Sequence, residues 1–64
     1  MSEKIEIFVT IVQETPYAIL VEHGYGPRVW IPKSQITDDG RSFKINDTVE
    51  IEIPVWLAED KEMV

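Results

Sequence analysis

Two segments of the chain alternate apolar and polar residues with a period of two. In the segment from Lys4 to Gln13, the alternate positions from residue 5 to residue 11 are all isoleucine or valine. In the segment from Thr48 to Ile53, Glu50 and Glu52 alternate with Val and Ile. Successive side chains of a β-strand point to opposite faces, so this period predicts two strands that each bury one face. The sequence therefore predicts a mainly β fold.

Three shorter apolar segments lie between these two strands. Tyr17 to Glu22 and Arg28 to Pro32 are separated by a glycine turn, and Pro16, which has no amide hydrogen, precedes the first of them. The short links predict an antiparallel meander of the first three strands. Arg41 to Ile45 predicts a further short strand that places Phe43 and Ile45 on one side.

Two short helical segments complete the expected architecture. Lys33 to Ile36 predicts one tight helical turn that directs Ile36 into the core. The Thr37-Asp38-Asp39-Gly40 run predicts an Asp-Gly turn, and Asn46-Asp47 predicts another turn. Pro54 suits the first position of a helix, and helix-forming residues follow it from Val55 to Met63.

Five short strands separated by turn residues favour a small barrel over a sandwich, which needs more strands. The predicted fold is a small antiparallel five-stranded barrel, OB-like or SH3-like, with a short C-terminal helix, and residues 1–64 form one domain. Closure depends on whether Arg41 to Ile45 supplies the fifth strand. An edge left unpaired would be a route to dimerisation.

The composition limits both stability and partners. A chain of 64 residues lies near the lower size limit for an independent core, and it has no cysteine for a disulfide or a thiolate metal site. Twelve acidic against six basic residues give a net charge of −6, which repels nucleic acid at long range. Without a long apolar stretch or a basic, apolar leader at Met1 to Lys4, we expect a cytoplasmic protein that enters no membrane.

The reactive residues do not form a recognisable catalytic or metal site. His23, the single histidine, lies in the glycine turn, where we expect it to be solvated. Ser34 has no second histidine to act as its base, and a turn cap is the ordinary role of such a serine. Glu50, Glu52 and Glu6 fit a solvated strand face. We therefore expect no enzyme, no cofactor and no metal ion.

A group of aromatic and cationic residues gathers around the third expected strand. On an OB-type barrel such a face could stack bases on its rings while its cations follow the phosphates. The alternative is ordinary, with a half-buried Trp30 and surface charges around it. The group consists of Tyr25, Arg28, Trp30 and Lys33, with Phe8 and Lys44 as further members.

Trp56 and Leu57 pose a similar choice on the C-terminal helix. Packing of Trp56 against the barrel is the simpler expectation, because so short a helix needs tertiary contacts. If both side chains were exposed, they would form a small apolar anchor of the kind that dominates protein interfaces.

Two resemblances add to these inferences. The run Y-A-I-L-V-E-H-G-Y-G-P-R-V-W-I-P-K-S-Q-I from Tyr17 to Ile36, followed by K-I-N-D-T-V-E-I-E-I, is similar to the RNA-binding OB barrels of ribosomal and RNA-processing proteins. It departs from them at Asn46, where that family has glycine, and in its acidic C-terminal helix. The resemblance implies an RNA-binding barrel.

The second resemblance spans most of the chain. W-I-P-K-S-Q-I from Trp30 to Ile36 and I-P-V-W-L-A-E-D-K from Ile53 to Lys61 resemble a family of small, uncharacterised bacterial and phage-encoded proteins with a WxPKSQ segment and a C-terminal PxWLA helix. This resemblance implies a bacterial or phage setting and brings no established activity.

Together these features favour a noncatalytic binding or accessory module that acts through contact with a protein partner or with its own copy. The alternative is a single-stranded nucleic-acid-binding barrel that uses the face of Arg28, Trp30 and Lys33. Loss of oligonucleotide binding in Trp30→Ala, with steep salt dependence, would distinguish the two.

Overall fold

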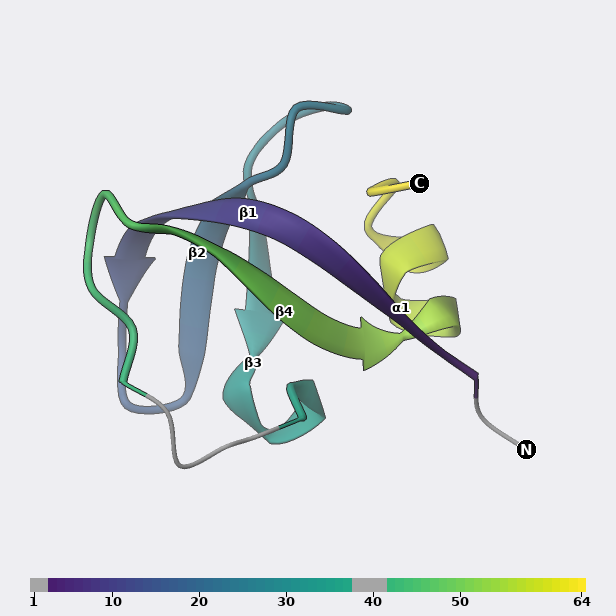
Figure 1. Ribbon diagram of the computed structural model, residues 1–64, viewed down its shortest axis with the longest axis horizontal. Coiled ribbons are helices and arrows are strands. Elements are labelled where there is room, and N and C mark those ends of the chain that lie inside the picture. Colours follow the sequence, from purple (N-terminus) through teal and green to yellow (C-terminus); the bar gives the residue numbers. More distant parts are fainter. Residues whose placement is uncertain (1–2, 38–41) are drawn as a thin grey trace.

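Four antiparallel strands and a short C-terminal helix form the molecule. The computed structural model describes residues 3–37 and 42–64. The sheet has the strand order β3-β2-β1-β4, and α1 lies at the end of the sheet where β1 begins and β4 ends (Figure 1). The elements are β1 (Lys4–Glu14), β2 (Ala18–Glu22), β3 (Val29–Pro32), the 3-10 turn η1 (Lys33–Gln35), β4 (Thr48–Pro54) and α1 (Val55–Asp60).

The long strand β1 organises the sheet, because it pairs with a different neighbour along each half. Its first half pairs with β4, from Lys4 opposite Pro54 to Thr10 opposite Thr48. Its second half pairs with β2, beginning at Thr10 opposite Glu22, and the register shifts by one residue at Val12. Such a bulge bends a strand and increases its twist, so β1 curves from one neighbour to the other.

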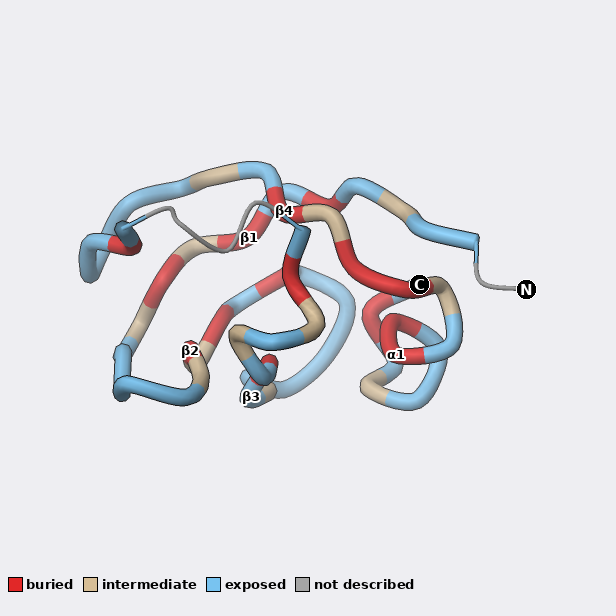
Figure 2. Tube along the Cα trace, turned by 90° about the horizontal axis from the view of Figure 1, so that it is seen from below, coloured by how far each residue is buried: buried red, intermediate tan, exposed pale blue. Residues whose placement is uncertain are grey.

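The predicted alternation is confirmed by the burial pattern. The inward side chains of the four strands are buried or partly buried, and together with Ile36, Phe43 and residues of α1 and the segment after it they form one core (Figure 2). Seven of these side chains are fully enclosed isoleucine or valine residues of the four strands: Val9, Ile11, Ile19, Val21, Ile31, Ile51 and Ile53. Ile36 is buried, as predicted.

The predicted fifth strand is not formed by the described part of its segment. Residues 42–44 have no regular secondary structure, and Arg41 and the predicted Asp-Gly turn at 38–40 lie outside the described residues. Phe43 is buried whereas Ile45 is exposed, so the prediction that they share one side is wrong. The turn at Asn46 is confirmed, with Asn46 at φ 76° and the Asp47 N–H donating to the Lys44 carbonyl (3.1 Å).

The sheet is consequently not closed. Strands β3 and β4 stand at its two edges and do not pair with each other. After Pro54 the chain forms α1 rather than another strand, and Leu57, Ala58 and Met63 cover part of the core from this position. The barrel prediction is thus correct in its antiparallel meander and its C-terminal helix, and it overstates the strand number and the closure.

The chain turns sharply after α1. The Glu62 N–H donates to the Glu59 carbonyl (3.1 Å) and the Met63 N–H to the Ala58 carbonyl (2.8 Å), while Glu62 itself has φ 57°. This is the Schellman arrangement, in which the residue after a helix cap takes the left-handed conformation and the next one packs back on the helix. It buries Met63 completely.

Candidate functional site

The first half of β1 is paired on one side only. Its edge on the β2 side has no partner strand in the described part of the chain. The pairing with β2 begins only at Thr10, so on that side the segment from Lys4 to Val9 faces no strand among the described residues. Chain direction explains the gap, because β2 ends at Glu22 and the chain leaves the sheet through the turn of Gly24, which has φ 86°.

The hydrogen bonds between β1 and its neighbour on the β4 side show which backbone groups of β1 point to the open edge. The Ile11 N–H donates to the Asp47 carbonyl (2.8 Å), and the Val55 N–H donates to the Glu3 carbonyl (2.9 Å). Odd-numbered residues of β1 therefore direct their backbone groups toward β4. Because these directions alternate along a strand, Glu6 and Phe8 direct their N–H and C=O groups to the opposite, open edge.

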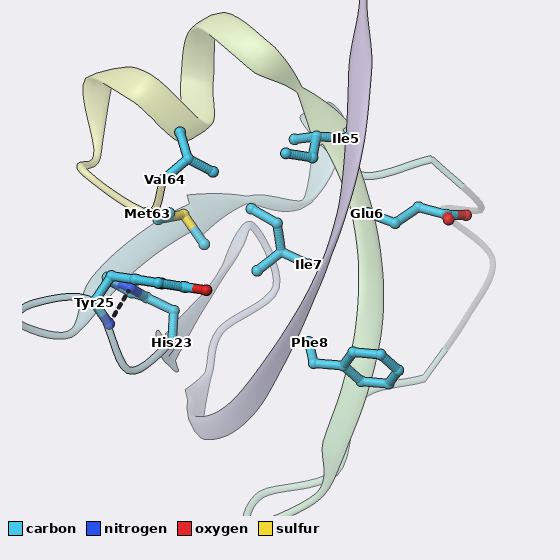
Figure 3. A pocket seen from close by; sticks show the side chains of 8 residues that line it. All are labelled: Ile5, Glu6, Ile7, Phe8, His23, Tyr25, Met63 and Val64. Carbon is cyan, nitrogen blue, oxygen red and sulfur yellow. Dashed lines mark hydrogen bonds between the residues drawn. The ribbon is translucent and has the colours of Figure 1, made fainter.

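An apolar depression of about 410 Å³ lies beside the open edge. It is lined by the β1 segment Ile5 to Phe8 and by His23, Tyr25, Met63 and Val64, and we call it the edge groove. Figure 3 shows Ile5 and Ile7 directed toward Met63 and Val64, whereas Glu6 and Phe8 extend from the other face of β1. The groove therefore runs up to the backbone of β1 itself.

His23 builds one wall of the edge groove. The prediction that this histidine is solvated is wrong, because it is only 8% exposed. The Tyr25 N–H donates to His23 Nδ1 (3.2 Å), so the ring proton belongs on Nε2, which lies 3.0 Å from the Pro27 carbonyl oxygen and donates to it. These two bonds tie the turn together and hold the Tyr25 ring stacked on the imidazole.

Glu6 lies on the outer face beside the open edge, and Glu50 and Glu52 of β4 lie across β1 from that edge. Glu6 stands directly opposite Glu52 of β4, and Phe8 stands opposite Glu50. The even-numbered residues of β1 form non-hydrogen-bonded pairs with β4, in which opposite side chains come closest, and like charges in such a pair are unfavourable. The neighbouring cation, Lys4, places its Nζ 2.7 Å from Thr37 Oγ1. Negative charge thus gathers beside the groove.

The three residues of the predicted nucleic-acid face lie along or beside β3. Trp30 is 44% exposed on the outer face, opposite Leu20. Arg28 forms an ion pair with Glu22 (3.5 Å), and Lys33 pairs with Glu14 (2.7 Å). The structure therefore places these residues along β3 or next to its ends, and it sets a carboxylate against each of the two cations.

The other predicted binding residues lie elsewhere. Tyr25 lines the edge groove, and Lys44 precedes the turn at the opposite end of β1. On α1, Trp56 is 54% exposed while Leu57 is 4% exposed within the core. The expectation that Trp56 packs on the barrel is wrong, and Leu57 is no part of an exposed anchor.

Sequence reasoning missed the groove residues Ile5, Ile7, Met63 and Val64. The two isoleucines have the strand period of core residues, and the tail residues follow an expected helix. A signal was present in the strand lengths, since the alternating segment Lys4 to Gln13 is much longer than its predicted partner Tyr17 to Glu22. A strand that is longer than its neighbour leaves part of its edge toward that neighbour unpaired.

No family model matches the chain, and no curated protein or solved structure matches it. The resemblances carried by Trp30 to Ile36 and Ile53 to Lys61 therefore stay predictions. Within residues 3–37 and 42–64, no three histidine or acidic side chains group as metal ligands would. None of the helices described is long and apolar enough to span a membrane.

Proposed function

We propose that the chain is a noncatalytic binding module that acts through protein contact. The observation that carries this proposal is the open edge of β1 beside the edge groove. An unpaired strand edge presents free backbone donors and acceptors in a fixed row, which other chains readily pair with. The apolar walls add a surface whose burial would contribute to binding.

The finer fold type belongs to the same proposal. We assign the sheet to the small barrels of OB-like or SH3-like type, with α1 in place of a closing strand. The bend of β1 between β4 and β2, and the 3-10 turn that follows β3, support this assignment. The resemblance of Trp30 to Ile36 and Ile53 to Lys61 supports a bacterial or phage setting.

A single-stranded nucleic-acid-binding barrel is the second candidate, favoured by the half-exposed Trp30. The ion pairs of Arg28 with Glu22 and of Lys33 with Glu14 reduce the positive charge that phosphates would meet on this face. Titration with mixed-sequence single-stranded DNA and RNA at low salt, followed by tryptophan fluorescence, separates the candidates. Salt-sensitive quenching that is lost in Trp30→Ala would replace the protein-contact proposal.

Site-specific photo-crosslinking in cells tests the protein-contact proposal directly. A photoreactive phenylalanine analogue replaces Phe8, which is 66% exposed beside the open edge. The matched control carries the analogue at Tyr17, which is also exposed and lies in the turn between β1 and β2. A protein adduct of defined mass from position 8 and not from position 17 supports the proposal, whereas equal adducts from both positions, or none, contradict it.

A further inference from the structure

We propose that the open edge of β1 binds an extended segment of a partner protein by strand addition, and that this segment alternates apolar with basic side chains. This inference rests on the proposed function and specifies the chemistry of the partner. Strand addition combines backbone hydrogen bonds, which give affinity, with pockets for alternate side chains, which give specificity. The open edge and the edge groove supply both components.

The backbone component is confined to a short, defined stretch. Glu6 and Phe8 each direct one donor and one acceptor to the open edge, and Thr10 marks the point where β2 takes over the ladder. Both the β2–β3 turn and the segment after α1 flank this stretch, as Figure 3 shows for Tyr25 and Met63. A single extended segment fits such a recessed edge better than the edge of a folded sheet.

The inward side chains of an added strand would meet apolar walls. Ile5 and Ile7 form one wall, and Met63 and Val64 form the other. Met63 is held in place by its bond to the Ala58 carbonyl, so this wall is built before a partner arrives. Every second residue of the partner should therefore be a medium-sized apolar one.

The outward side chains would stand beside Glu6, an exposed carboxylate on β1 itself. Glu6 faces Glu52 across the strand pair, and no cation among the described residues forms an ion pair with either of them. An added strand would lie on the other side of β1 from β4, so a lysine or arginine on it would stand beside Glu6 and offset the negative charge there. The intervening residues of the partner should therefore be basic.

Charge also argues against a second copy of this chain as the occupant. Each copy has a net charge of −6, and pairing two β1 edges would place a Glu6 on each of the two paired strands, so both the net charges and these side chains would repel. The same carboxylates would repel the phosphates of a nucleic acid. A basic, extended protein segment is the occupant that this surface complements.

The test uses a short synthetic peptide that alternates valine and lysine, with amide hydrogen exchange measured by NMR on the whole chain. We expect the peptide to slow exchange of the Glu6 and Phe8 amides by about tenfold or more, because these N–H groups become hydrogen-bonded. A peptide of the same composition in scrambled order should not do so. Protection that spares Glu6 and Phe8, or equal effects of both peptides, would overturn strand addition.

A charge-reversal variant tests whether the partner segment is basic. Glu6→Lys should weaken binding of the valine–lysine peptide several-fold, because it replaces an exposed charge that attracts the lysines with one that repels them. Since the substitution also replaces a like-charge pair with an opposite one, it should not destabilise the fold. Asp47→Lys, the same charge change in the turn at the far end of β1, is the control and should bind normally. Equal binding by the two variants would contradict the basic-segment assignment.

The outcomes separate this inference from the proposed function. If position 8 crosslinks to a protein but the peptide neither binds nor protects Glu6 and Phe8, strand addition is wrong and the protein-contact module survives. If neither crosslinking nor peptide binding occurs, both fail. Protection of Glu6 and Phe8 that rises with protein concentration alone would assign the edge to a second copy and overturn the inference.

Discussion

Glu62 adopts a backbone conformation that suits glycine better than glutamate. With φ 57° it occupies the left-handed region at the position after the helix cap, where glycine is the usual residue. We predict that Glu62→Gly raises the free energy of unfolding by about 0.5–1 kcal/mol, since the left-handed penalty of a β-carbon outweighs the added chain entropy. Urea denaturation of the two proteins measures the difference.

The control for Glu62→Gly is Glu59→Gly, within α1. There the backbone is helical, so glycine should lower the free energy of unfolding by about 0.5 kcal/mol or more. Opposite signs for the two substitutions would establish the Schellman geometry in solution, and a loss of stability at both positions would contradict it.

His23 is the second residue whose local geometry has a measurable consequence. Its two ring nitrogens bond the Pro27 carbonyl and the Tyr25 N–H, and the side chain is buried. We predict that His23→Ala lowers the free energy of unfolding by about 1–2 kcal/mol and speeds hydrogen exchange of the Tyr25 amide, because two hydrogen bonds of the turn are lost. Thermal or urea unfolding and NMR exchange measure the two effects.

Tyr25→Ala separates these hydrogen bonds from ring stacking. This variant keeps the backbone N–H that bonds Nδ1 and removes only the stacked, largely exposed ring. It should change stability much less than His23→Ala does. If the two variants were equally destabilised, stacking rather than hydrogen bonding would hold the turn.

Residue patterns alone could not have placed His23. A histidine among glycines is typically solvated, and its burial depends on two partners that lie two and four residues away in a turn of unpredicted shape. Asn46 was easier, because asparagine before aspartate is typical of turns and tolerates a positive φ.

At the scale of elements, the segment after α1 determines whether the open end of the sheet is covered. Met63 is fully buried whereas the next residue, Val64, is 61% exposed. We predict that Met63→Ala lowers the free energy of unfolding by about 2–4 kcal/mol, the usual effect of truncating a buried methionine. Val64→Ala should change it by less than about 0.5 kcal/mol. Urea unfolding of both variants is the measurement, and similar losses would show that the tail does not pack as described.

The elements themselves were largely readable from the sequence. Strict alternation predicted β1 and β4, and the glycine and proline positions predicted the hairpins and the start of α1. Closure of the sheet into a barrel could not be predicted from the sequence, because it depends on whether the two edge strands meet in space. Residues 42–44 have a strand-like composition, yet Phe43 packs into the core and no ladder forms there.

At the scale of the whole molecule, repulsion among carboxylates should oppose folding. The net charge of −6 resides on only 64 residues, and folding sets Glu6 opposite Glu52. Among the described residues, the ion pairs are those of Arg28 with Glu22 and Lys33 with Glu14, both at least partly solvent-exposed, and such pairs contribute little.

We therefore predict that sodium chloride stabilises the protein. Screening weakens repulsion and attraction alike, and because repulsion dominates here, the midpoint of urea unfolding should rise as salt increases toward about 0.15 M, where the screening length is about 8 Å. The gain should be up to about 1 kcal/mol and smaller in Glu6→Lys, in which the like-charge pair of Glu6 and Glu52 has been removed. A midpoint that falls with salt would mean that ion pairs outweigh the repulsion, and it would remove the electrostatic reason for a basic partner at this edge.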